Sequence, residues 1–120
     1  MTNGLYILDR DGEVLDRDDG RCRFEMDGRS MRRLCDDMQT LGMVQVEGSS
    51  TGIPKDTLCS SEGWVVSTRA ISQALEAFGR CDARDLQAVR EHWQDEEGNR
   101  FDRWVEFLRT AEGAGGLQVW

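Results

Sequence analysis

Several residue types are nearly absent from this sequence, and the scarcity of histidine excludes the most chemistry. His92 is the only histidine among the 120 residues, so any Ser–His–Asp or Cys–His scheme would have to use it. It lies in "REHW", on the shoulder of a short amphipathic segment, where a structural role is the simpler interpretation. A zinc site would need this one histidine together with distant cysteines. We therefore expect no catalytic residue, no bound metal and no cofactor, and we expect that the protein is not an enzyme.

Long hydrophobic runs and closely spaced cysteines are also missing. No apolar run approaches the ~20 residues that a transmembrane helix needs, and the opening "MTNGLYILDR" has acidic and turn residues where a signal peptide is apolar. We therefore expect a cytoplasmic protein that does not bind membranes. The cysteines are spaced by 13, 24 and 22 residues, unlike a zinc site, and we interpret them as reduced, apolar core residues: Cys22, Cys35, Cys59 and Cys81.

Basic residues are too few to balance the acidic ones. The chain has 15 Lys and Arg against 23 Asp and Glu, for a net charge of −8. This charge argues against direct binding to nucleic acid or to an anionic membrane. Lys55 is the only lysine, and arginine forms bidentate pairs with carboxylates. At this length and with 38% hydrophobic residues, we expect a single domain over residues 1–120.

The first half of the chain is patterned as strands followed by a helix. "GLYIL", "EVL" and "RCRFEMD" are separated by Asp-Gly turns, which predicts a three-stranded antiparallel meander. Ser30 is expected to cap the next helix, with Gly42 as its stop. The apolar stripe of this helix is Met31, Leu34, Cys35, Met38 and Leu41. "MVQV" is compatible with a short strand, and residues 47–62 are expected to form a loop that packs down through Ile53 and Leu58.

Helical periodicity dominates the second half. "GWVVS" is expected to be a strand leading into a helix capped by Ser67 or Thr68 and ended by Gly79. "DARDLQAVREHW" predicts a shorter helix, residues 100–112 predict the last one, and "LQVW" is expected to be a terminal strand. We read Trp64 and Trp104 as core residues, because each lies in an apolar pattern. The fold class is therefore α+β, a small, mostly antiparallel sheet packed against about four helices.

Three stretches in combination carry a resemblance: "RFEMDGRSMRRLCDDMQTLGM", "SSEGWVVSTRAISQALEAF" and "DRWVEFLRTAEGAGGLQVW". Over roughly residues 23–120 the chain resembles a family of small bacterial and phage-associated proteins with no assigned activity. In that family a strand leads into a helix. A strand-to-helix turn comes next, and then an aromatic helix that is followed by a Gly-rich strand. This chain has Ser61 and Met43 where the family tends to have Asn and Trp. The resemblance implies a fold and no catalytic residue.

The acidic stretch "LDRDGEVLDRDDG" looks most like a site. An EF-hand loop needs oxygen ligands at positions 1, 3 and 5, Gly at 6 and Glu at 12, and neither a start at Asp9 nor one at Asp16 fits. Two hairpin turns explain its Asp and Gly residues. Two alternatives stay open for these carboxylates. They form a row that mimics the phosphates of nucleic acid and binds a basic partner, or they form a surface that is only solvated. The candidate binding carboxylates are Asp11, Asp16, Asp18 and Asp19.

Tryptophan is frequent for this length, and interfaces favour Trp and Arg. Trp93 and Trp120 are the candidates for an interface role. We therefore expect a non-enzymatic acidic protein that acts stoichiometrically on a protein partner with a basic surface, as phage accessory, immunity or inhibitor-like proteins do. The alternative is a small-ligand or nucleotide-binding protein, with or without enzymatic activity, that uses arginines in a cleft.

Overall fold

The computed structural model describes residues 2–15, 22–45, 51–58, 64–96 and 98–119. In chain order its elements are β1 (Thr2–Ile7), β2 (Arg23–Asp27), α1 (Gly28–Thr40), α2 (Lys55–Leu58), β3 (Trp64–Val66), α3 (Thr68–Arg80), α4 (Ala83–Trp93), β4 (Gln94–Asp95), β5 (Gly98–Asn99), α5 (Arg100–Glu112) and β6 (Leu117–Val119).

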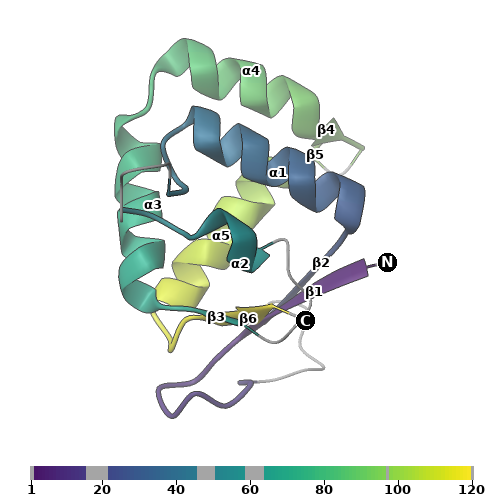
Figure 1. The fold of residues 1–120 in the computed structure, drawn as a ribbon. Helices are drawn as coiled ribbons and strands as arrows, with labels where there is room; N and C mark the ends of the chain where they lie inside the picture. The colour runs from purple at the N-terminus through teal and green to yellow at the C-terminus, as the bar shows by residue number, and fades with distance from the viewer. Residues whose placement is uncertain (1, 16–21, 46–50, 59–63, 97, 120) are drawn as a thin grey trace.

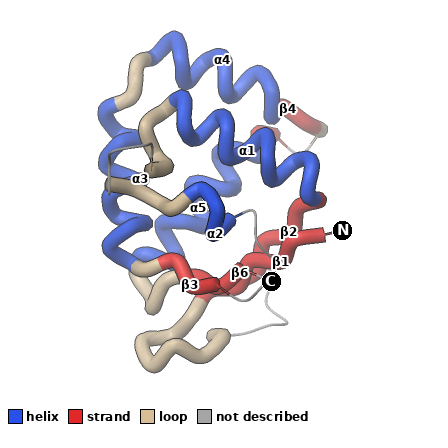
Figure 2. Tube along the Cα trace, in the orientation of Figure 1, coloured by secondary structure: helices blue, strands red, loops and turns tan. Residues whose placement is uncertain are grey.

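Four strands form the main sheet in the order β2-β1-β6-β3, and each adjacent pair is antiparallel. The C-terminal strand β6 therefore lies between the N-terminal strand and β3. The helices lie on one side of this sheet, with α5 running behind α1 and α2 (Figure 1). Figure 2 shows the same two layers, with the four strands of the main sheet below the helices and β4 separate from them at the end of α4. The α+β class predicted from the sequence is confirmed.

The two faces of the sheet differ in burial. On the face toward the helices, the side chains of Leu5, Ile7, Leu117 and Val119 are fully buried. The alternate residues Tyr6 and Gln118 are only half-buried, and Val65, in register with Gln118, is exposed. Because successive side chains of a strand point to opposite faces, the second face of the sheet carries this half-exposed row.

The helices bury the stripes that the periodicity predicts. All five apolar residues predicted for the first helix are buried, between 0% and 4% exposed. The core of α5 is aromatic, and Trp104 is fully buried with its ring 5.3 Å from that of Phe24 and 5.8 Å from that of Phe107. Its Nε1–H donates to the sulfur of Met38 at 3.2 Å. Helix α5 thus links the sheet to α1 through one tryptophan.

Ser67 caps α3, as predicted, but α1 is capped by Asp27 and not by Ser30. The Asp27 carboxylate accepts the Ser30 backbone N–H at 2.7 Å. Strand β2 runs directly into this helix, so the first residue able to cap lies three positions earlier than expected. This hydrogen bond from the Ser30 N–H, then that from the Ser30 side chain, and more weakly Arg100 and Arg29, lower the pKa of Asp27 below its usual value.

This cap predicts a pH-dependent loss of stability. Because its pKa is lower in the folded than in the unfolded chain, Asp27 stabilises the fold above the unfolded pKa of about 4 and loses that contribution as the pH falls through the folded value. Asn also caps helices but does not titrate. The stability advantage of the wild type over Asp27→Asn, measured by urea unfolding, should therefore shrink between neutral pH and pH about 2. An advantage that stays constant or grows on acidification would contradict this.

The predicted three-stranded meander is wrong. Strand β2 pairs directly with β1, and "EVL" contributes only an isolated bridge between Leu8 and Val14. Strands β2 and β6 already pair with the two edges of β1. A further strand could therefore pair only with the residues that follow Ile7. The Asp-Gly turn itself is confirmed. The Asp9 carboxylate accepts the N–H groups of Asp11 and Glu13, and Gly12 has a positive φ of 85°.

Three further boundaries differ from the sequence expectation. Helix α3 continues through Gly79 to Arg80. "MVQV" makes an isolated parallel bridge, Val44 to Ile53, and the predicted loop contains the single-turn helix α2. Ile53 and Leu58 are fully buried, so that segment packs down as expected.

Candidate functional site

The outer strand β3 exposes two consecutive apolar residues, whose side chains point to opposite faces of the sheet. Trp64 is 53% exposed and Val65 is 57% exposed, and Leu15 is the only other large apolar residue so exposed among the described residues. The prediction that Trp64 is a core residue is wrong. Trp64 shares a strand face with the buried Val66, but it is the first residue of β3, the last strand of the sheet, and only Val66, next to the start of α3, is buried.

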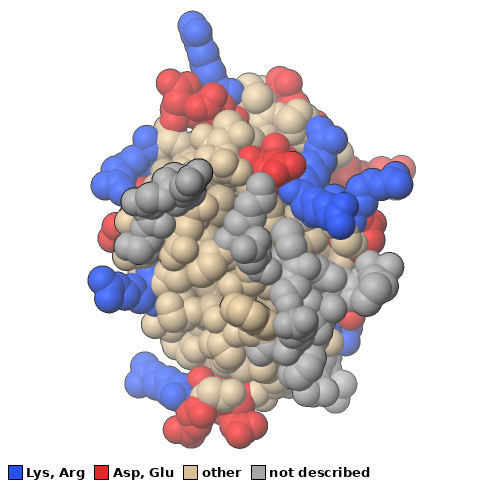
Figure 3. Space-filling model, viewed as in Figure 1, with Lys and Arg blue, Asp and Glu red and all other residues tan. Residues whose placement is uncertain are grey.

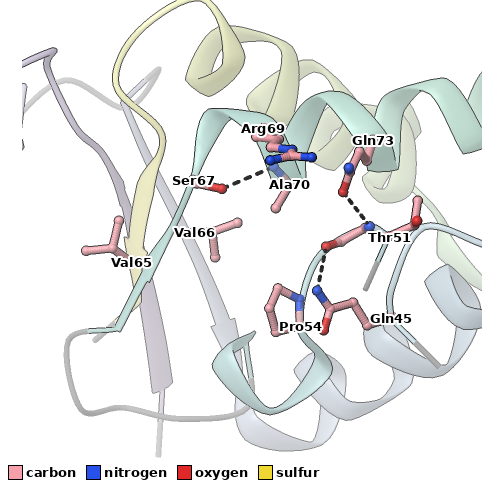
Figure 4. Close-up of a pocket in the computed structure, with 10 residues that line it drawn as sticks. Gln45, Thr51, Pro54, Val65, Val66, Ser67, Arg69, Ala70 and Gln73 are labelled. Atoms are coloured by element: carbon pink, nitrogen blue, oxygen red, sulfur yellow. Dashed lines mark hydrogen bonds between the residues drawn. The ribbon is translucent and has the colours of Figure 1, made fainter. Parts of the chain in front are cut away.

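A groove of about 450 Å³ lies beside this strand, between β3, the start of α3 and residues 51–54 (Figure 4). Its polar walls are held by internal hydrogen bonds. Gln73 accepts the N–H of Gly52 at 2.9 Å, and Gln45 donates to the carbonyl of Gly52 at 3.4 Å. Gly52 has a φ of 100°, and a side chain there would meet the carbonyl oxygen of Met43, so only glycine fits. Arg69 lines the groove and is exposed.

The acidic turn of residues 9–13 lies at the same end of the sheet as the exit of β3. The Leu8 N–H donates to the carbonyl of Gly116 at 2.9 Å, and the Gly115 N–H donates to that of Leu8 at 2.7 Å. Gly116 in turn lies against the backbone of Val66. Asp11, a predicted binding residue, is exposed on this turn. The other candidates of the acidic segment, Asp16, Asp18 and Asp19, lie outside the described residues, as does Trp120.

Charge is distributed unevenly over the visible surface. In Figure 3, acidic and basic side chains lie around the rim, an acidic group lies near the upper middle, and the described side chains below that group are mostly uncharged. A group of basic side chains gathers over the first turns of α1, at the upper right. The exposed arginines of those turns are Arg29, Arg32 and Arg33.

Trp93 does not offer an exposed ring, contrary to the prediction that it serves as an interface anchor. It is 7% exposed, and its Nε1–H donates to the Asp37 carboxylate at 2.7 Å. His92 Nδ1 lies 3.4 Å from both oxygens of the same carboxylate. Asp37 is itself 8% exposed. A buried carboxylate on α1 therefore fixes two adjacent side chains at the end of α4.

A second pocket, of about 380 Å³, opens where the end of α4 meets the start of α1. His92 at the end of α4 and Asp95 on β4 line it, together with Ser30 and Arg33 on α1 and Arg100 at the start of α5. The alternative expected from the sequence, arginines in a cleft, corresponds to this place. The sequence places three polar residues of α1 on one helix face, because they are three and four positions apart: Ser30, Arg33 and Asp37. It does not show that this face lies close to His92.

The cysteines behave as apolar residues where they are described. Cys22 and Cys35 are buried, as predicted, and Cys81 is half-buried. Burial, and then the carboxylates of Asp85 and Asp82, raise the pKa of the Cys81 thiol, which disfavours its reactive thiolate. Cys59 lies outside the described residues. Within the described part of the chain no His, Cys, Asp and Glu side chains cluster as metal ligands, and no helix has the length and apolar character to cross a bilayer.

Comparison with known proteins adds no family: no family model, curated protein or solved structure matches this chain.

Proposed function

We propose that this protein is a non-enzymatic binding protein that acts stoichiometrically on a protein partner with a basic surface. The observation that carries the proposal is the exposed edge strand β3, where Trp64 on one face and Val65 on the other are both more than half exposed. Burial of a tryptophan is among the commonest sources of binding energy at protein interfaces. The resemblance noted above favours a phage accessory, immunity or inhibitor-like role of this kind.

The surroundings of these two residues supply the other parts of an interface. The groove beside β3 can accept a side chain of the partner, and Arg69 at its rim can donate to a carbonyl or carboxylate. The nearby acidic turn exposes Asp11 and Glu13, which can meet basic groups at the periphery of the contact.

The net charge of −8 favours a basic partner over a second copy of this chain. Two copies repel each other, whereas a basic protein is attracted and its association is accelerated, most strongly at low ionic strength. We therefore expect complex formation to be faster at low salt.

The test compares two doubly substituted proteins as baits in a lysate of the source organism. Trp64→Thr/Val65→Thr removes the apolar pair but keeps strand-forming residues. Arg84→Ala/Gln87→Ala is the control, since both of its residues are exposed on α4, on the opposite side of the molecule from β3 (Figure 1). Quantitative mass spectrometry should find a basic protein that the first variant retains about tenfold less than the wild type does, because each buried anchor contributes about 1 kcal/mol or more.

The control variant should retain that basic protein as the wild type does. Equal retention by the two variants would refute the role of β3. An acidic protein as the specific partner, or a stable homodimer that the Trp64→Thr/Val65→Thr change disrupts, would refute the proposed partner class.

A further inference from the structure

The pocket between α1 and α4 collects positive charge in a protein that is otherwise strongly acidic. Arg33 and Arg100 both line it. Arg33 has no ion pair or hydrogen bond with any described residue. Arg100 uses one guanidinium nitrogen to donate to the backbone carbonyl of Glu25 at 3.2 Å, which leaves its other N–H groups for a ligand.

The carboxylates near this pocket are largely engaged elsewhere. Asp95, the one carboxylate in the lining, is held by Arg103 with contacts of 2.6 and 3.4 Å. Asp27, whose pKa the charge of Arg100 helps to lower, accepts the backbone N–H of Ser30 in the first turn of α1. Asp37 does not line the pocket, and it lies beside two residues that do, Trp93 and His92. Arg33 and Arg100 therefore keep guanidinium N–H groups that none of these three carboxylates binds.

Asp37 orients the histidine toward a ligand. With Nδ1 beside the carboxylate, the ring geometry places Nε2 on the opposite side of the ring, and the His92 side chain is 42% exposed. A carboxylate beside Nδ1 favours the tautomer with the hydrogen on Nδ1, which leaves a lone pair on Nε2. That nitrogen can accept a P–O–H hydrogen, or, when protonated, donate to a phosphate oxygen. The Trp93 N–H holds the carboxylate in place at 2.7 Å.

We propose that this pocket binds a small molecule bearing a phosphate group, with Arg33 and Arg100 as the charged donors and His92 as the third contact. Guanidinium groups match phosphate oxygens in geometry and charge. The volume of about 380 Å³ lies in the range of small-molecule sites, so it has room for more than the phosphate itself. This site is separate from β3, and its occupancy does not depend on the proposed protein partner.

The test titrates the purified protein with inorganic phosphate and, in parallel, with adenosine monophosphate, at constant ionic strength balanced with chloride. Isothermal titration calorimetry and amide NMR shifts report binding. Arg33→Gln and Arg100→Gln should each weaken it about tenfold or more, since each removes a charge-assisted hydrogen bond. Arg32→Gln is the matched control, because Arg32 is exposed on the same helix one residue away and does not line the pocket. It should change the affinity less than about twofold.

The two probes separate the sources of the phosphate. Similar affinities would assign the site to phosphate alone, and tighter binding of the monophosphate would assign it to a phosphate ester. Two results overturn the proposal: no saturable binding of either probe at millimolar concentration, or equal weakening by Arg33→Gln and Arg32→Gln, which would indicate diffuse attraction to the surface. Unchanged amide spectra away from position 100 would show that Arg100→Gln still folds, and Arg33→Gln tests the proposal without touching Glu25.

Discussion

Replacement of Gly115 by alanine is expected to lower the free energy of unfolding by roughly 3 kcal/mol or more, or to prevent folding altogether. A β-carbon at this position would overlap the backbone carbonyl of Asp9 and lie 3.0 Å from that of Leu8. Neither contact is with a flexible side chain, so the backbone would have to move. That movement would break the Gly115 to Leu8 hydrogen bond, which joins the acidic turn to the start of β6.

Gly113→Ala is the control for this substitution. Gly113 ends α5 with a φ of −74°, and a β-carbon there would meet its nearest atom, the Thr110 carbonyl oxygen, at 3.7 Å. We expect it to leave stability unchanged or to raise it by up to about 1 kcal/mol. Denaturant unfolding of both variants measures the difference. If the two glycines tolerate alanine equally, the close approach of β6 to the turn is wrong, and so is the position of the acidic turn beside β3.

Trp104→Ala is expected to cost about 3–5 kcal/mol, a large part of the 5–15 kcal/mol that stabilises an ordinary domain. This side chain is fully buried against Phe24 and Phe107 and donates to Met38. Its removal would leave a cavity between α5, α1 and the sheet, where surrounding elements cannot collapse together.

Trp64→Thr provides the comparison, because it removes the same residue type from the surface. Trp64 is 53% exposed, so the substitution removes only part of a buried contact and should lower the free energy of unfolding by about 1 kcal/mol or less. Urea unfolding followed by circular dichroism measures both. A small loss for Trp104→Ala, or a loss of similar size for the two variants, would contradict the assignment of one tryptophan to the core and the other to the surface.

Local patterns predicted most of the elements. The stripe from Met31 to Leu41 has helical spacing and lies on α1, and the Asp-Gly turn near Gly12 forms as its residue types indicate. These features depend on residues that are close together in the chain, so a single sequence is enough to predict them.

Properties set by long-range pairing were not predictable in the same way. Burial of a strand residue depends on where its strand falls in the sheet. Trp64 and Val66 look alike in an apolar run, yet on the edge strand β3 the end next to α3 is buried and the opposite end, with the tryptophan, is exposed. Likewise, Asp37 and Trp93 are 56 residues apart. Nothing local indicates that the helices bearing them meet, so the sequence alone does not show that the ring of Trp93 is buried.

The most direct test of β3 as the interface is site-specific photo-crosslinking. A benzoylphenylalanine replaces Val65 in one protein and Gln87 on α4 in another, and both are irradiated in a lysate of the source organism. Both positions are exposed. We predict that the probe at position 65 crosslinks to one basic protein, that added salt reduces the yield, and that the probe at position 87 does not crosslink to this protein. A crosslink to the same protein from position 87 alone, or none from position 65, would contradict the account.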